Sequence, residues 1–114
     1  RHTENVEDLL LAERAAGPRD WIARLRKVAA HGDFRSSATS PERLWEVLEN
    51  PAARAETRVA AAVALGPHLD AEGRARIRVA AGAIAAPHLR VAVEAAAAEE
   101  PDSAELERLL KLVE

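Results

Sequence analysis

The side chains best suited to chemistry in this 114-residue sequence are arginines, which cluster between positions 54 and 90. Two pairs in this cluster lie four residues apart, so a helix would place like charges on one face at a cost of a few tenths of a kcal/mol. The planar fork of a guanidinium is well suited to bind a carboxylate or a phosphate. We therefore predict a partner-binding surface made of Arg54, Arg58, Arg74, Arg78 and Arg90.

The alternative role for these arginines is structural. Glutamates are frequent in the same region, and an ion pair between two helices would tie the helices together instead of leaving a guanidinium free for a partner. The acidic side chains available for such pairs are Glu46, Glu49, Glu56, Glu72 and Glu94. Of the two roles, pairing is the simpler interpretation.

Two histidines occupy matching positions, because each follows a proline in Pro67-His68-Leu69 and Pro87-His88-Leu89. A metal site would need at least a third donor at tetrahedral distances, for which Asp70 and Glu94 are the candidates. A loop histidine that satisfies a helix end is the simpler interpretation, and the other histidines show no ligand spacing. The sequence therefore predicts no metal-binding residue and no cofactor.

Other patterns of catalysis and binding are missing from the sequence. The serines lie in a loop or at helix starts, and no glycine-rich phosphate loop is present. The chain has no cysteine, which excludes disulfides and thiol chemistry. A net charge of −3 gives no basic footprint for nucleic acid, and no apolar run approaches the roughly 20 residues that span a bilayer. We therefore expect a cytoplasmic protein that is not an enzyme, has no catalytic residue and binds no nucleic acid.

Helical periodicity, together with proline and glycine punctuation, defines the elements that would position these side chains. All six prolines fall where one predicted helix ends or the next begins. Alanine, the best helix former, makes up about a quarter of the chain. An interior of alanine, valine and leucine suits closely packed helices and suits a β-sandwich poorly. The predicted helices are residues 4–16, 18–31, 41–49, 54–65, 71–85, 87–99 and 103–113.

Apolar side chains three and four residues apart predict the buried face of each helix. Both tryptophans fall within such stripes, so we expect them in the core, although tryptophan also anchors protein partners. Phe34 is expected to fold back onto the core from a loop. The predicted buried set includes Trp21, Ile22, Leu25, Leu44, Trp45, Val47, Leu48, Val59, Val63, Ile77, Ile84, Leu89, Val93, Leu106, Leu109, Leu110 and Val113.

Capping residues make several helix starts specific. Thr39 or Ser40 is expected to cap the helix from residue 41, Asp70 the helix from residue 71, and Asp102 with Glu105 the last helix. Gly82 lies inside a predicted helix at a cost of roughly 1 kcal/mol relative to alanine. We therefore expect another helix to cross closely at Gly82.

A short phrase recurs within the alanine-rich region. The triplet Arg-Val-Ala begins at Arg58, Arg78 and Arg90, and the first and last copies are 32 positions apart. Periods of roughly 30 to 47 residues carried by paired helices are typical of stacked helical repeats. The repeated phrases therefore indicate two helix pairs with related sequences.

These phrases resemble bacterial HEAT-like repeats over residues 42–99. The resemblance lies in the alanine-rich segments Arg58–Gly66 and Pro87–Ala97 and in the turns at Asn50-Pro51 and Ala86-Pro87. It implies an all-α fold, a right-handed α–α superhelix with two helix pairs in residues 41–99. Residues 1–40 and 100–114 would then cap the exposed apolar ends. The alternative is an irregular bundle of the same helices.

The organisation and role follow from this resemblance as expectations. Residues 1–114 should form a single domain, and a chain that starts with arginine and lacks methionine is expected to be a piece of a longer, bacterial protein. The predicted function is a protein-interaction or scaffold module whose partner is another protein or domain. The alternatives are a cytoplasmic domain of a membrane protein and a HEAT-like domain that binds a ligand or nucleic acid.

Overall fold

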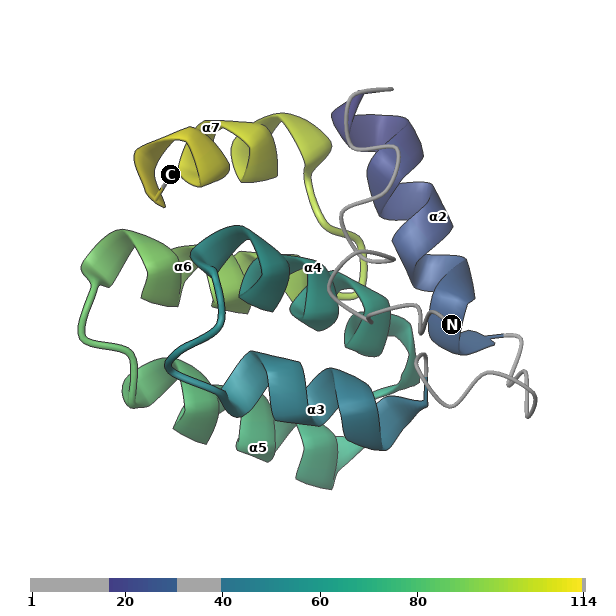
Figure 1. The fold of residues 1–114 in the computed structure, drawn as a ribbon. Helices are drawn as coiled ribbons and strands as arrows, with labels where there is room; N and C mark the ends of the chain where they lie inside the picture. The colour runs from purple at the N-terminus through teal and green to yellow at the C-terminus, as the bar shows by residue number, and fades with distance from the viewer. Residues whose placement is uncertain (1–16, 31–39, 114) are drawn as a thin grey trace, which may run out of the picture.

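The computed structural model describes residues 17–30 and 40–113, which contain six α-helices, one short 3-10 helix and no strand. The prediction of an all-α chain is confirmed for these residues. The predicted helix 4–16, Phe34 and Thr39 lie outside them. The elements are α2 (Pro18–Ala30), α3 (Pro41–Glu49), α4 (Ala55–Leu65), η3 (Gly66–His68), α5 (Ala71–Gly82), α6 (Pro87–Ala96) and α7 (Ser103–Val113), shown in Figure 1.

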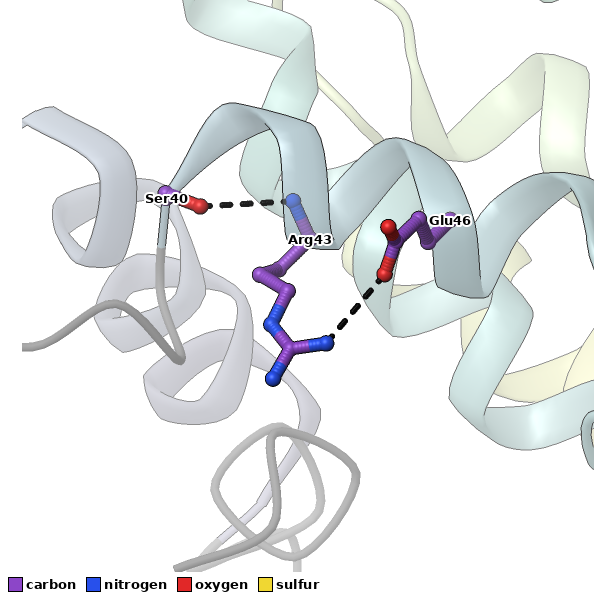
Figure 2. Close-up of polar contacts among 3 residues, drawn as sticks. All are labelled: Ser40, Arg43 and Glu46. Carbon is purple, nitrogen blue, oxygen red and sulfur yellow. Dashed lines mark hydrogen bonds and ion pairs between the residues drawn. The ribbon is translucent and has the colours of Figure 1, made fainter.

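The helix starts follow the predicted capping residues. Ser40 Oγ accepts a hydrogen bond from the Arg43 backbone N–H at 3.3 Å, and the Arg43 side chain reaches on to Glu46, as Figure 2 shows. Asp70 Oδ1 accepts from the Gly73 N–H at 2.7 Å in the same way, and Asp102 Oδ1 accepts from the N–H groups of residues 104 and 105. Each cap satisfies donors that the first turn of a helix leaves free.

Two helices end three residues before their predicted ends, α5 at Gly82 and α6 at Ala96. Residues that precede a proline are disfavoured in the helical region, so the chain must leave the helix ahead of Pro87 and Pro101. Ala86 accordingly has extended backbone angles. The alanines after each helix end therefore belong to the connections, although their helix propensity is high.

The helices lie in three layers, which can be followed in Figure 1. Helices α3 and α5 form one outer layer, α4 and α6 the middle layer, and α2 and α7 lie on the opposite side of the middle layer. Helices α2 and α7 also contact each other. Helix α2 packs mainly on α4, and α7 packs mainly on α6.

Helix α4 is the centre of this arrangement. It contacts α2, α3, α6 and α7, and all nine residues from Thr57 to Leu65 are buried. A helix that is apolar on every side is stable only when neighbours surround it. Its alanines allow those neighbours to approach closely, so this short helix can be enclosed by four others.

The predicted buried faces are confirmed. Val59, Val63 and Val93 are 0% exposed, and Ile77 is 5% exposed. The rest of the predicted set is also buried, except for Trp45 and Val113, which are partly buried. The expectation of a close helix crossing at Gly82 is wrong, because nothing lies within 4 Å of the position of a Cβ there. The close approach is at Gly66, where a Cβ would lie 3.2 Å from the Ala97 carbonyl oxygen.

One polar group inside the core lacks a partner. Thr57 Oγ1 is fully buried in α4 and has no hydrogen-bond partner among the residues that the structure describes. A buried hydroxyl without a partner costs roughly 1–3 kcal/mol. The shape of threonine suits this site, but its hydroxyl does not.

We predict opposite effects for two glycine substitutions. Gly66→Ala should lower the free energy of unfolding by about 1–3 kcal/mol, because the added methyl group meets two backbone carbonyls that cannot turn away. Gly82→Ala should raise it by about 0.5 kcal/mol, because open space surrounds Gly82 and alanine favours the helix. Urea unfolding of both variants measures the difference, and equal effects would contradict the close approach at Gly66.

A second prediction concerns the unpartnered hydroxyl. Thr57→Val replaces the hydroxyl by a methyl group of similar size, so it should leave stability unchanged or raise it by about 1 kcal/mol. Thr57→Ala, the control, leaves a small cavity and should lower stability by about 1 kcal/mol. Thermal unfolding followed by circular dichroism compares the two, and a large loss for the valine variant would mean that the hydroxyl has a partner.

Candidate functional site

Three of the five predicted site arginines bind the ends of neighbouring helices. Arg58 Nε donates to the Leu48 carbonyl oxygen at 2.9 Å. Arg90 donates to the Ile84 carbonyl oxygen through Nε at 3.3 Å and through Nη2 at 3.0 Å. Arg74 Nη1 donates to the Ala97 carbonyl oxygen at 3.3 Å. Carbonyls at a helix C-terminus lack partners within the helix and carry its partial negative charge. These arginines therefore stabilise the ends of α3, α5 and α6.

Arg58 is the most enclosed of the three, with 7% of its surface exposed. The sequence placed it on a binding surface, but its position in the buried helix α4 turns it inward, towards α3. Burial lowers the pKa of the Arg58 guanidinium. An arginine starts so far above neutrality that the side chain remains charged at physiological pH.

The ion pairs of the structure support the structural role of other arginines. Arg54 pairs with Glu56 at 3.4 Å. Arg76 forms two hydrogen bonds with Glu49, at 2.6 and 2.8 Å, and its guanidinium lies 4.2 Å from the centre of the Trp45 ring. The hydrogen bond with Glu49 raises the pKa of Arg76. This pair joins α5 to α3, as expected for glutamates that tie helices together.

The remaining predicted arginine, Arg78, lies with Arg74 in a cleft of about 300 Å³ between α5 and the end of α6. Arg78 is exposed and Arg74 is half-buried. Glu94 of α6 also lines this cleft, and Leu69 and Ile77 supply aliphatic walls. Thus only two of the five predicted site residues come together around one free space.

A second cleft of about 570 Å³ lies on the other side of α5, between that helix, the end of α3 and the start of α6. Its lining is mainly aliphatic and includes Val79, Ile84 and Leu89, with Arg58 and Glu49 at its wall. Val79 is 73% exposed, the highest value among the large hydrophobic side chains of the described residues. The cleft therefore offers apolar surface to a ligand.

The exposure of Val79 could have been predicted from the spacing of apolar residues around it. Ile77, Ala80 and Ala81 form the buried face of α5 at spacings of three and four, and position 79 lies off that face. A valine outside the buried stripe of its helix is a candidate for contact with a partner. The clefts themselves depend on how α5 packs against α3 and α6, which no local pattern specifies.

The histidines do not form a metal site within the described part of the chain. His68 and His88 are both exposed. No group of three or more histidine, cysteine, aspartate or glutamate side chains with a metal-binding arrangement is found in residues 17–30 and 40–113. Among the described helices, none has the length and apolar character needed to cross a membrane.

Comparison of the sequence with models of protein families, with curated proteins and with solved structures finds no match. The interpretation of the two clefts therefore depends on their geometry. They combine guanidinium donors, single carboxylates and aliphatic walls, which are groups suited to binding.

We predict that Arg58 and Arg90, which both donate to a carbonyl at the end of a neighbouring helix, differ in their contribution to stability. Arg58→Met should lower the free energy of unfolding by about 2 kcal/mol, because the buried Leu48 carbonyl loses a charged donor. Arg90→Met, the control, removes a similar bond at an exposed position and should cost about 1 kcal/mol or less. Denaturant unfolding measures both. A gain in stability for Arg58→Met would mean that burying the charge costs more than its hydrogen bond returns.

Proposed function

We propose that this chain is a HEAT-like helical-repeat module, part of a larger bacterial protein, which binds another protein and has no catalytic role. The observation that carries the proposal is the aliphatic cleft beside α5, with the exposed Val79 at its edge. The partner would fill the cleft with an apolar side chain.

A repeated contact supports the HEAT-like part of the proposal. Arg58 and Arg90 each occupy the fourth position of the second helix of a pair, α4 and α6. Each donates to a backbone carbonyl at the end of the first helix, that of Leu48 in the last turn of α3 and that of Ile84 just after α5. Two copies of one helix pair are expected to share such an arginine-to-carbonyl hydrogen bond, and here the two arginines are 32 positions apart.

The arrangement of the pairs supports it further. The second helices α4 and α6 pack side by side, and the first helices α3 and α5 are joined by the Arg76–Glu49 pair. Neighbouring copies in a helical-repeat stack contact each other in this way, first helix to first and second to second. The third copy of the triplet, at Arg78, does not fit this register, because Arg78 lies in the second half of α5, a first helix, and not near the start of a second helix.

The energy available at the larger cleft is adequate for a protein anchor. Burying a valine side chain from water contributes roughly 1.5–3 kcal/mol, and an apolar side chain of the partner would contribute a similar amount. Exposed apolar surface rimmed by polar residues is a feature of protein-interaction sites. Glu49, which is paired with Arg76, and Arg58 supply polar groups at the wall of this cleft.

A photo-crosslinking residue at position 79 of the parent protein, in its own cells, tests the proposal. We expect it to trap one protein, while the same residue at Leu112, a 55% exposed position on α7, should not trap that protein. The trapped protein should then bind the purified chain at a saturable level.

Substitutions complete the test. Val79→Glu should weaken that binding at least about tenfold, because the cleft would have to accept a charge at its apolar edge. Leu112→Glu should change it less than about twofold. Neither variant should alter stability by more than about 0.5 kcal/mol, because both positions are exposed. Binding that is insensitive to Val79→Glu would remove the cleft from the proposed function.

A further inference from the structure

The smaller cleft, between α5 and the end of α6, holds charged side chains that do not neutralise one another. Arg74, Arg78 and Glu94 all line it. Among the ion pairs of the described residues, none joins either arginine to Glu94. Elsewhere on α5 the opposite holds, since Arg76 forms a tight pair with Glu49. The cleft is therefore lined by charged groups that are not joined in an ion pair.

The two arginines differ in burial and in hydrogen bonding, and both have N–H donors left for a ligand. Arg74 is half-buried and is held by a single nitrogen, Nη1, on the Ala97 carbonyl. A guanidinium has five N–H donors, so most of those of Arg74 are left for other acceptors. Arg78 lies one turn further along the same helix face and is exposed, and its guanidinium has no hydrogen bond or ion pair among the described residues. An anion between them would relieve their mutual repulsion.

The charge of the cleft selects the type of anion. Two arginines and one glutamate leave a net charge of +1, which matches a monoanion such as a carboxylate. A phosphate monoester carries close to two negative charges at neutral pH and would be repelled by Glu94. The planar guanidinium also fits the two oxygens of a carboxylate side by side.

The walls of the cleft select what the carboxylate is attached to. Leu69 and Ile77 are aliphatic, and Ala97 and Ala98 close the α6 side. The volume of about 300 Å³ is at the lower limit of small-molecule sites, so it suits one aliphatic group with its carboxylate. A ligand that is only charged would leave this apolar surface unused.

We propose that this cleft binds an aliphatic monocarboxylate, with the carboxylate on Arg74 and Arg78 and the aliphatic group against Leu69 and Ile77. Two sources carry this chemistry, a free short-chain acid and the C-terminus of a polypeptide that ends in an aliphatic residue. The inference goes beyond the proposed function, because it names a ligand for a second site. It uses a different cleft from the one beside Val79, so the two can fail separately.

An NMR titration of the ¹⁵N-labelled chain at low salt tests the proposal with three probes. They are an acetylated tripeptide ending in leucine with a free carboxylate, the same peptide as its carboxamide, and isovalerate. We expect the free-acid peptide to shift the backbone signals of Ile77, Arg78 and Ala98 and to saturate. The carboxamide should bind about tenfold more weakly, because it loses a charge-assisted hydrogen bond.

Comparison of the probes identifies the source. Isovalerate with an affinity within about threefold of the peptide would assign the site to a free acid, and much weaker isovalerate binding would assign it to a polypeptide terminus. Inorganic phosphate should shift these signals less than either acid does. Tighter binding of phosphate, or equal binding of the acid and the carboxamide, would overturn the proposal.

Matched variants complete the experiment. Arg78→Gln should weaken binding of the free-acid peptide about tenfold, whereas Arg108→Gln, the same charge change at an exposed position on α7, should change it less than about twofold. Glu94→Gln should strengthen binding about two- to threefold by removing the like charge. The NMR spectra of the variants report whether each is folded. Titrations that show no localised, saturable shift, or that are unaffected by Arg78→Gln, would refute the site.

Discussion

The enclosure of α4 is the constraint on which the rest of the structure depends. Nine consecutive buried residues can be stable only if neighbours cover every side of the helix, and α2, α3, α6 and α7 do so. Alanine and glycine make this possible, because a larger residue at Gly66 would meet the backbone of the chain after α6. The small side chains thus determine the layer spacing, and the layer spacing determines which helices can touch.

This enclosure explains why so many arginines are occupied. Short helices have a large share of carbonyls without partners at their ends, and the close packing around α4 keeps water from some of them. A guanidinium on a long side chain reaches across from the next helix, as Arg58 does to Leu48 and Arg90 to Ile84. Arg26 makes the same kind of bond, to the Glu99 carbonyl between α6 and α7. Arg74 donates to the Ala97 carbonyl in the same way, so four arginines of the described residues act as donors to backbone carbonyls of other segments.

The features of this chain that could be predicted from its sequence are those that depend on residues close together in the chain. Stripes at spacings of three and four located the buried faces, and Ser40, Asp70 and Asp102 were recognisable as caps, because each depends on neighbours within one or two turns. The contacts of the arginines could not be predicted from their spacing. Spacing cannot distinguish Arg58, which donates to a carbonyl ten residues away, from Arg78, which lines a cleft. Gly82 shows the same limit, because a glycine in a helix does not reveal whether anything crosses it.

Helix α5 differs from α4 in a way that bears on function. It packs mainly on α6, through Ile77, Ala80 and Ala81, and its link to α3 depends on the exposed pair of Arg76 and Glu49. A helix held on one face leaves its flanks open, and the two clefts described above border those flanks. One flank of α5 borders a mainly aliphatic cleft, and the other carries two arginines that form no ion pair among the described residues. The two sides of α5 therefore present different kinds of surface. The same packing that buries residues 57–65 of α4 therefore leaves both flanks of α5 open.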